Sequence, residues 1–477
     1  MKANIKKWIC ISLTLALLCG LFAVGAAAAM RGDVDKDGTV QPSDARLALR
    51  RSVLLENYQP GSSQFIAADM DGDGAVSAGD ARSVLRVAAG LTGGMEEITP
   101  AEKTPDETFH NAMLAFALAL FRQTAADDAG ENLLVSPLSV MTALSMAANG
   151  ARGETLAQLE QALGGLTAED LNAYLHMLTE KLPNTEYSRL HVANSLWVNN
   201  RVRGYAQKPF LQNMLACFGA GINACDFDQA GVDAVNNWVK ENTDGMIDSI
   251  LDEPDPEILM LLMNALAFDA KWADPFEETA VKKATFTRAD GTQEFCDMMR
   301  GIEHIYLEDE DAVGFVKPYL GGGYRFAALL PNEDIPLADY IASLTPEKLS
   351  ALLNGAQQEY PVRIGLPEFT FDYSVKLNDA LKAMGVKMLF DPFDCDLSGM
   401  FPREIGAYVS DVLHKTFIEV NTEGTRAAAV TAIFAKANAM PLFEYKTVVL
   451  DRPFVFLITM GEADTPVFIG AINSCGK

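Results

Sequence analysis

The chain has 477 residues, of which 49% are hydrophobic and 21% are charged. This composition is that of a folded protein with about two or three domains, and it excludes a disordered or fibrous chain. The net charge of −26 argues against nucleic acid as a partner, because such a field repels phosphates.

The first 29 residues have the three-part pattern of a secretory signal peptide. Lys2, Lys6 and Lys7 precede an apolar run over residues 8–24, and small residues follow at 25–29. The apolar run is shorter than a comfortable membrane span. We therefore expect residues 1–29 to be removed, which leaves a secreted, extracellular protein with no membrane association; a retained membrane anchor is the less favoured alternative.

The cysteines do not form a disulfide framework. The region after residue 29 contains five of them, an odd number in a large chain. They are Cys217, Cys225, Cys296, Cys395 and Cys475. One disulfide bond among these five cysteines is possible, but the sequence does not show which two would form it.

Residues 33–50 and 69–86 repeat one another at an offset of 36, with ten of eighteen positions identical. Each copy places carboxylates at places 1, 3, 5 and 12 of a calcium loop and a glycine at place 6, where the chain must turn sharply. A backbone carbonyl at place 7 completes each ligand set. The predicted calcium ligands are Asp33, Asp35, Asp37, Thr39 and Asp44 in the first loop, and Asp69, Asp71, Asp73, Ala75 and Asp80 in the second.

A helical apolar pattern follows each loop, and no helix of comparable strength precedes it. Paired loop–helix units with this spacing resemble the dockerin module. The resemblance implies a small all-α domain over residues 30–93 that holds two calcium ions and binds a cohesin domain on a cellulosome-type scaffold. Residues 94–107 mix Gly, Pro and acids, which is typical of a linker.

The remaining region, residues 108–477, begins with an amphipathic helix marked by Phe109, Met113, Phe116, Ala117 and Leu120. Helix and strand patterns then alternate to the end of the chain. The GxSxG, HExxH and P-loop motifs are absent from the sequence, and its five histidines are scattered. We therefore expect no catalytic residues and no enzymatic activity.

Eight segments of this region resemble serpins, in the order in which that family has them. They are NLLVSPLSV (132–140), NGARGET (149–155), ANSLW (193–197), NNWVKENTDGMI (236–247), NALAFDAKWADPF (264–276), LPEF (366–369), HKTFIEVNTEGTRAAAVTA (414–432) and DRPFVFLI (451–458). The resemblance implies an α+β fold with three β-sheets, about nine helices and an exposed reactive-centre loop. It also implies inhibition of serine proteases and, in some members, cysteine proteases.

The alanine-rich stretch near residues 423–440 has two interpretations. Alanine has the highest helix propensity, which favours a helix. The resemblance instead implies a reactive-centre loop that a protease cuts and that then enters the main sheet as a new strand. The family's hinge corresponds to Glu423, Gly424, Thr425, Arg426, Ala427, Ala428, Ala429, Val430 and Thr431.

The residue pattern fits such an inserted strand. Alternate side chains of a strand point to opposite faces. The odd positions from Thr425 to Ala437 are all small or apolar, whereas the even positions include Arg426, Lys436 and Asn438. No proline interrupts the segment before Pro441.

Counting from the hinge places the reactive bond between Asn438 and Ala439. The alternatives are cleavage after Lys436 by a trypsin-like protease, after Ala437 by an elastase-like one, or after Phe434 or Leu442 by one with a large apolar pocket. We expect a target of the subtilisin or elastase type.

Three positions match the family's shutter, the region that holds the central strands together. They are Ser136, Asn264 and His414, and the resemblance implies a hydrogen bond between the last two. Trp272 matches the aromatic residue where the loop enters the sheet. Two positions depart from the family pattern: Thr422 and Glu368 replace a glutamate and a lysine, so the family's ion pair is absent there.

The sequence thus predicts a secreted, monomeric suicide inhibitor that its dockerin attaches to an extracellular scaffold. One rival is a non-inhibitory serpin used for binding or structure. A less favoured rival is a scaffold-borne hydrolase.

Overall fold

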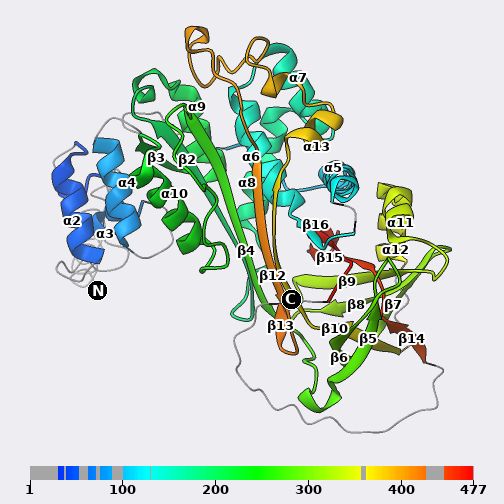
Figure 1. The fold of residues 1–477 in the computed structure, drawn as a ribbon. Coiled ribbons are helices and arrows are strands. Elements are labelled where there is room, and N and C mark those ends of the chain that lie inside the picture. The colour runs from blue at the N-terminus through cyan, green and yellow to red at the C-terminus, as the bar shows by residue number, and fades with distance from the viewer. Residues whose placement is uncertain are drawn as a thin grey trace, which may run out of the picture. The chain divides into compact units, whose positions relative to one another are not determined.

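The computed structural model describes residues 31–36, 39–52, 63–70, 76–88, 100–128, 130–355, 361–425 and 445–475. The chain divides into two compact units, Met1–Glu96 and Glu97–Lys477, which we call the small unit and the large unit (Figure 1). The predicted signal peptide lies outside the described residues. Within the described residues, no helix combines the length and apolar character that a membrane crossing requires.

The small unit is built from helices α2 (Pro42–Ser52), α3 (Ser63–Ala68) and α4 (Ala78–Ala88). Helices α2 and α4 follow the two predicted calcium loops and pack against each other. The short α3 precedes the second loop and was not predicted. A core of small side chains joins the elements: Val34, Ala45, Ala48, Ala68, Ala81 and Val84. The prediction of an all-α module of paired loops and helices is confirmed.

Among its described residues, the large unit contains the remaining α-helices and four short 3-10 helices. The α-helices are α5 (Glu107–Asp127), α6 (Pro137–Gly150), α7 (Gly153–Ala162), α8 (Ala168–Glu180), α9 (Lys208–Phe218), α10 (Gln229–Asn242), α11 (Leu337–Ser343), α12 (Pro346–Asn354) and α13 (Asn378–Ala383). The 3-10 helices are η1 (Arg203–Tyr205), η2 (Glu278–Ala280), η3 (Met388–Phe390) and η4 (Arg403–Ile405). The apolar residues that predicted the first helix are all buried in α5.

Three sheets form the rest of the large unit. The main sheet has the order β11 (Phe369–Lys376), β12 (Leu413–Val420), β13 (Gly424–Thr425), β4 (Met260–Lys271), β2 (Ser188–Asn199) and β3 (Gly221–Cys225). The buried sheet has the order β1 (Leu133–Val135), β16 (Thr465–Ile472), β15 (Phe454–Met460), β9 (Tyr324–Pro331), β8 (Ala312–Pro318) and β7 (Ile305–Glu308). The four-stranded sheet has the order β14 (Lys446–Val449), β10 (Val362–Pro367), β6 (Gln293–Glu303) and β5 (Lys282–Thr287).

Burial explains the different sequence patterns of these strands. Strands β15 and β16 are buried at every position, which accounts for their nearly continuous apolar sequence. Strand β12 instead alternates, with His414, Thr416, Ile418 and Val420 buried and the residues between them partly exposed. Such alternation is typical of a strand with one face on the core.

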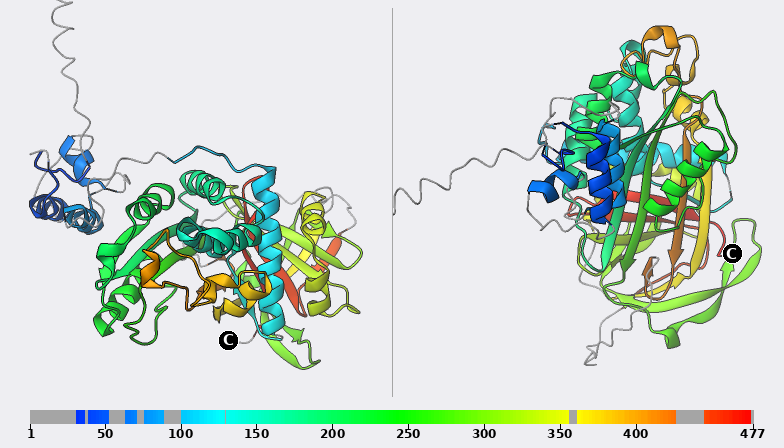
Figure 2. Two further views of the ribbon diagram at one scale, coloured as in Figure 1. Left: turned by 90° about the horizontal axis from the view of Figure 1, so that it is seen from above. Right: turned by 90° about the vertical axis from the view of Figure 1, so that its left-hand side faces the viewer.

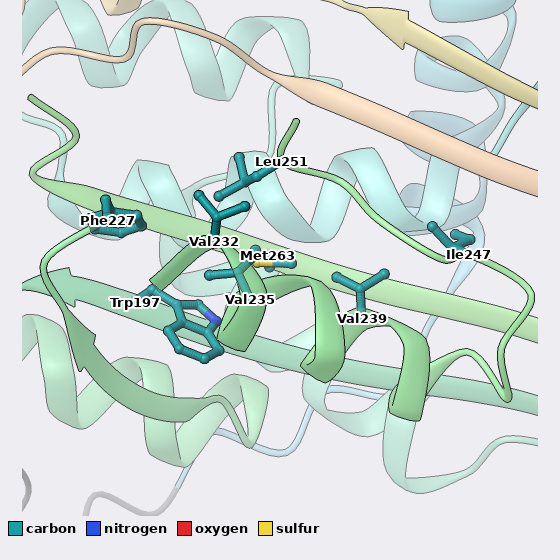
Figure 3. Packing of buried hydrophobic residues seen from close by; sticks show 8 residues of the cluster. All are labelled: Trp197, Phe227, Val232, Val235, Val239, Ile247, Leu251 and Met263. Atoms are coloured by element: carbon teal, nitrogen blue, oxygen red, sulfur yellow. The ribbon is translucent and has the colours of Figure 1, made fainter. Parts of the chain in front are cut away.

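Helices cover both faces of the main sheet. Helix α6 packs against β4 and β16, and α10 packs against β2 and β4. Figures 1 and 2 show α10 on one side of the sheet and α6 and α8 on the other. Figure 3 shows that α10 contributes Val232, Val235 and Val239 to an apolar cluster with Trp197 of β2 and Met263 of β4. The cluster holds α10 against the sheet.

The end of the predicted linker is bound to the large unit. Lys103 forms an ion pair of 2.8 Å with Asp170 of α8, and its ammonium lies 4.4 Å from the centre of the Tyr174 ring. The Tyr174 hydroxyl donates to Asp106, which in turn accepts from the N–H of Phe109 and caps α5. Residues 103–106 therefore contact the folded domain, whereas the predicted linker extends to residue 107.

The cluster under α10 predicts a stability effect. Val235 is fully buried, so Val235→Ala should leave a cavity and lower the free energy of unfolding of the large unit by about 2 kcal/mol. Denaturant unfolding followed by circular dichroism measures the change. Asn237→Ala, on the exposed side of the same helix, is the matched control and should change stability by less than about 0.5 kcal/mol.

Candidate functional site

A tight turn after β12 brings the chain back into the main sheet. The Asn421 side-chain carbonyl accepts hydrogen bonds from the N–H groups of Glu423 and Gly424, at 3.0 and 3.1 Å. The Asn421 N–H donates to the Gly424 carbonyl at 3.0 Å. Asparagine is favoured in turns because its side chain can bond to the backbone in this way. The turn directs Gly424 and Thr425 back along β12.

Strand β13 lies between β12 and β4 and pairs antiparallel with both. Thr425 lies opposite Val420 on one side and Ala270 on the other. Thr425 is 2% exposed, and its side chain lies on the same face as the buried Val420. The first predicted hinge residues therefore already occupy a place in the main sheet.

Gly424 is required by the close approach of β13 to β4. A Cβ atom at this position would lie 2.0 Å from the Ala270 carbonyl oxygen, which is far inside van der Waals contact. Any side chain here would push the strand out of its place. The glycine of the predicted hinge therefore serves close packing, since its backbone conformation is not a left-handed one.

Trp272 fixes the turn and the strand together. Its ring N–H donates to the Asn421 carbonyl, and its backbone N–H donates to the Glu423 carbonyl, both at 2.9 Å. The indole stacks on Tyr319 with 4.5 Å between ring centres. The Tyr319 hydroxyl hydrogen-bonds with the Thr425 hydroxyl at 2.5 Å. Trp272 was predicted at this place; Tyr319 was not.

A buried ion pair lies beneath this aromatic stack. Lys317 and Glu303 are 2.6 Å apart, with side chains only 3% and 7% exposed. The Lys317 ammonium also donates to the Asp274 carbonyl at 2.7 Å and lies 4.2 Å from the centre of the Phe276 ring. Burial raises the pKa of the Glu303 carboxyl, and the Lys317 charge opposes that rise.

We call Glu303, Trp272, Lys317, Tyr319 and Thr425 the hinge cluster. Sequence reasoning missed three of these residues. A signal for Lys317 exists, because a lysine interrupts the apolar sequence of β8, and such a charge inside a buried strand needs a partner. The partner itself, Glu303, comes from a different sheet.

The two positions that depart from the family pattern are both held through the backbone. The Thr422 carbonyl accepts from the Phe276 N–H at 2.9 Å. The Glu368 N–H donates to the Asp297 carbonyl at 2.8 Å. The turn at the hinge is thus bound at Thr422 by a contact that does not involve the Thr422 side chain.

The predicted shutter residues have different partners from those implied. The Ser136 N–H donates to the His414 Nε2 at 3.0 Å, and the Ser136 hydroxyl donates to the Val467 carbonyl. Asn264 donates to Asn194 at 2.9 Å. The buried Oδ1 of Asn264 has no hydrogen-bond partner among the described residues. The structure thus pairs Ser136 with His414, and the implied bond between Asn264 and His414 is not formed in it.

Burial keeps His414 neutral. The side chain lies in the core between the main sheet and the start of α6, and burial lowers its pKa to about 4. A neutral imidazole that accepts at Nε2 carries its proton on Nδ1. The shutter is therefore an uncharged hydrogen-bonding group at neutral pH.

A small pocket opens beside Thr425, in line with β13. Its lining comes from both neighbouring strands and from the core behind them. The lining residues are Leu134, Met246, Phe268, Phe417, Ile418, Glu419, Thr425, Ile458 and Phe468. The pocket is lined mainly by apolar side chains, so it suits a small apolar group.

Most of the predicted loop lies outside the described residues. This applies to the hinge residues from Arg426 to Thr431 and to both candidate reactive bonds, Asn438–Ala439 and Lys436–Ala437. Glu423, Gly424 and Thr425 are the hinge positions that the structure describes.

In the small unit, the structure brings carboxylates of the first predicted calcium loop together. Ligand oxygens of Asp33, Asp35 and Asp44 all lie within 4.8 Å of one another. Such a group of oxygens fits a hard divalent cation. Asp37 of this loop lies outside the described residues, as do Asp71, Asp73 and Ala75 of the second loop.

The two loops are built alike. Asp44 accepts from the N–H groups of Val34 and Gln41 at 2.7 and 2.8 Å. Asp80 accepts from Met70 and Ser77, the corresponding residues of the second copy, both at 2.7 Å. Asp44 and Asp80 are both buried. The sequence duplication is therefore also a duplication of loop structure.

Comparison with known proteins supports both the large unit and the small unit as predicted. Residues 111–475 match the family model described as Serpin (serine protease inhibitor), and residues 31–86 match that of the Dockerin type I domain. Iripin-8 of Ixodes ricinus is 34% identical, over 75% of this chain and 91% of that protein. The Leukocyte elastase inhibitor of Homo sapiens is 31% identical, over 77% of this chain and 100% of that protein.

A solved structure of the thermophilic serpin tengpin in its native state is also similar. It superposes with a TM-score of 0.74 at 42% identity and covers 80% of this chain and 97% of its own. The chain therefore belongs to the serpin family of serine protease inhibitors and carries a dockerin type I domain ahead of the serpin domain.

Proposed function

We propose that this protein is a suicide inhibitor of serine proteases that traps its target by extending β13 into the main sheet. The single observation that carries the proposal is the position of Thr425, buried between β12 and β4 and paired with both. A strand that has been started there can continue along both neighbours once a cut frees its far end.

The observed register indicates where each loop residue would lie. If the pairing of Thr425 continues, residue 427 lies opposite Ile418 and Phe268, which both line the pocket beside Thr425. Residue 427 is an alanine, the small apolar group that this pocket suits. The first step of insertion would therefore fill existing space and displace little.

The same register links the loop to the shutter. Residue 431 would lie opposite both His414 and Asn264, and it shares the inward face of Thr425. Residue 431 is a threonine, so its hydroxyl could donate to the Asn264 Oδ1, which has no partner among the described residues. A buried acceptor without a partner costs free energy, and insertion would remove that cost.

The protease carries out the chemical step, and this chain supplies the loop that holds the protease covalently bound. The catalytic serine of the target attacks the carbonyl of the reactive bond, the C–N bond breaks, and the loop remains attached to the protease as an ester. Insertion must then outrun hydrolysis of that ester. Because the inhibitor is consumed in the process, we infer that it is not an enzyme.

We infer that the reactive bond is Asn438–Ala439, with Lys436–Ala437 as the alternative. The target is a protease of the subtilisin or elastase type. Similarity to a protein named Leukocyte elastase inhibitor supports the second type, as do the alanines at positions 437 and 439 beside Asn438.

The dockerin places the inhibitor on a scaffold. Dockerin type I domains bind calcium, and we propose two ions, one in each loop, because Asp44 and Asp80 make equivalent contacts. The partner is a cohesin domain of an extracellular, cellulosome-type scaffold. The signal-like sequence of residues 1–29 supports secretion. We also propose that the whole protein, with both units, is a monomer.

The direction of side chains in the inserted strand gives the first test. Thr425→Arg would bury a cation beside Tyr319 without a partner, at a cost of several kcal/mol. Because Thr425 is already buried in the intact protein, the arginine should displace β13 from the sheet, and insertion would then have to bury the cation. Insertion should slow by roughly a hundredfold or more, so the variant should become a substrate that the protease cuts without being trapped. The measurement is the yield of covalent complex on a denaturing gel with subtilisin- and elastase-like proteases.

Ala428→Arg is the matched control for Thr425→Arg. It adds the same charge in the same loop, but at an even position that faces away from the core, so complex formation should persist. Equal complex yield from both variants would overturn the proposed register. Failure of the unmodified chain to form a complex with any protease of the panel would favour the non-inhibitory alternative.

Cleavage should also stabilise the protein. A strand that continues to Ala437 adds on the order of ten backbone hydrogen bonds, each worth about 1 kcal/mol, and about 1 kcal/mol shifts the melting midpoint of a domain this large by about 2 °C. The nicked protein should therefore melt about 20 °C higher than the intact one in calorimetry. Nicked Thr425→Arg serves as the control, with little rise expected; an unchanged midpoint in the unmodified chain would contradict insertion.

Removing calcium should separate the two activities. A chelator should unfold the small unit, seen as lost helical circular dichroism, and abolish cohesin binding while protease inhibition persists. Titration calorimetry should find two ions in the intact protein and one in each of Asp44→Ala and Asp80→Ala. Cohesin binding that survives chelation would refute the calcium requirement.

A further inference from the structure

The C-terminal end of the chain is fastened to β6 of the four-stranded sheet. The Cys475 N–H donates to the Glu294 carboxylate at 2.6 Å, and the Ser474 hydroxyl donates to the same group at 2.9 Å. Arg288 forms an ion pair with Glu294 and also donates to the Ser474 hydroxyl at 2.7 Å. These contacts fix the backbone of Cys475 beside β6.

Cys296 lies two residues from Glu294 along β6, so the two side chains share one face of the strand. Phe295, between them, is 78% exposed, whereas Cys296 is 4% exposed. The Cys296 thiol donates to the Ala284 carbonyl at 3.6 Å. Cys296 therefore lies on the same face of β6 as Glu294, which binds the backbone of Cys475.

The two cysteines are brought near each other, because the Cys475 backbone is bound to Glu294 and Cys296 follows Glu294 on the same face of β6. The influence of each thiol on the other agrees with this placement, since it lowers the pKa of Cys296 and raises the pKa of Cys475. Both are free thiols in this structure. The other three cysteines differ, because burial is the main cause of the raised pKa in Cys217, Cys225 and Cys395, and no cysteine partner contributes.

We propose that Cys296 and Cys475 form a disulfide bond when the protein meets an oxidising environment. The setting rests on the secretion proposed above, since disulfides persist outside the cytosol. In the reaction, one cysteine thiolate attacks a small-molecule disulfide and releases one thiol. The second cysteine then attacks the mixed disulfide and releases the other. Two thiols of the chain thereby lose two protons and two electrons, and the oxidant gains them as two free thiols.

The position of this bond along the chain gives it a consequence. Cys296 precedes the loop at residues 426–444, and Cys475 follows it. A cut anywhere in the loop divides the chain into two fragments, and the second carries β14, β15 and β16. The disulfide would keep the two fragments covalently joined after the inhibitor has been cut.

The test uses the full chain and does not require inhibition, because any protease that cuts the loop will serve. The protein is incubated with glutathione disulfide, cut within residues 426–444 by limited proteolysis, and run on a denaturing gel with and without reductant. Without reductant, the C-terminal fragment should remain attached; with reductant, it should be released completely, as confirmed by mass spectrometry. Complete release without reductant would overturn the proposal.

Variants locate the bond. Cys475→Ser and Cys296→Ser should each release the fragment without reductant, whereas Cys217→Ser, the matched control, should retain it. Thiol titration of the oxidised chain should show two fewer free thiols than the reduced chain. An unchanged thiol count would refute the proposal even if one of the variants failed to fold. None of these results depends on whether a covalent protease complex forms.

Discussion

The serpin domain depends on the pairing of Thr425 with two strands at once. These strands, β12 and β4, are neighbours in space but far apart in sequence. Val420 and Ala270 flank Thr425 in the main sheet. The pairing fixes the register and the inward face for every residue that could follow. Because side chains alternate along a strand, the proposed insertion would turn the small residues of the loop toward the core and would turn Arg426 and Lys436 to the other side.

The hinge cluster connects this point to all three sheets. Thr425 belongs to the main sheet, Lys317 to the buried sheet and Glu303 to the four-stranded sheet. A buried ion pair contributes little net stability, but removing one partner leaves a costly unpaired charge. The Lys317–Glu303 pair therefore acts mainly as a geometric constraint. It holds the aromatic stack of Trp272 and Tyr319 at the place where the strand begins.

The small unit and the large unit differ in the groups that they bury. In the small unit, buried carboxylates at Asp44 and Asp80 organise short loops that suit a cation, and the apolar core consists of alanine and valine side chains. In the large unit, an extensive apolar core leaves space beside Thr425 and a buried acceptor at Asn264 without a partner among the described residues. The first arrangement suits a divalent cation, and in the second an apolar pocket and a buried acceptor remain unfilled among the described residues.

The sequence by itself determined the features that depend on local spacing. The aspartates of the repeats, the order of the serpin segments, the amphipathic pattern of α5 and the parity of the small loop residues can all be found along the chain, because calcium loops, helices and strands have fixed periods. It also identified Trp272, Ser136 and His414, through the motifs that contain them.

Only the tertiary structure decided the contacts that join distant segments. These include Tyr319 with Thr425, Lys317 with Glu303, Ser136 with His414, and Cys475 with Glu294. The start of the hinge illustrates the difference: the structure begins a strand at Gly424, whereas the alanines that follow Thr425 lie outside the described residues. Local propensity is worth less than 1 kcal/mol per residue, whereas burial and pairing between β12 and β4 depend on how three sheets come together, and no local pattern encodes that arrangement.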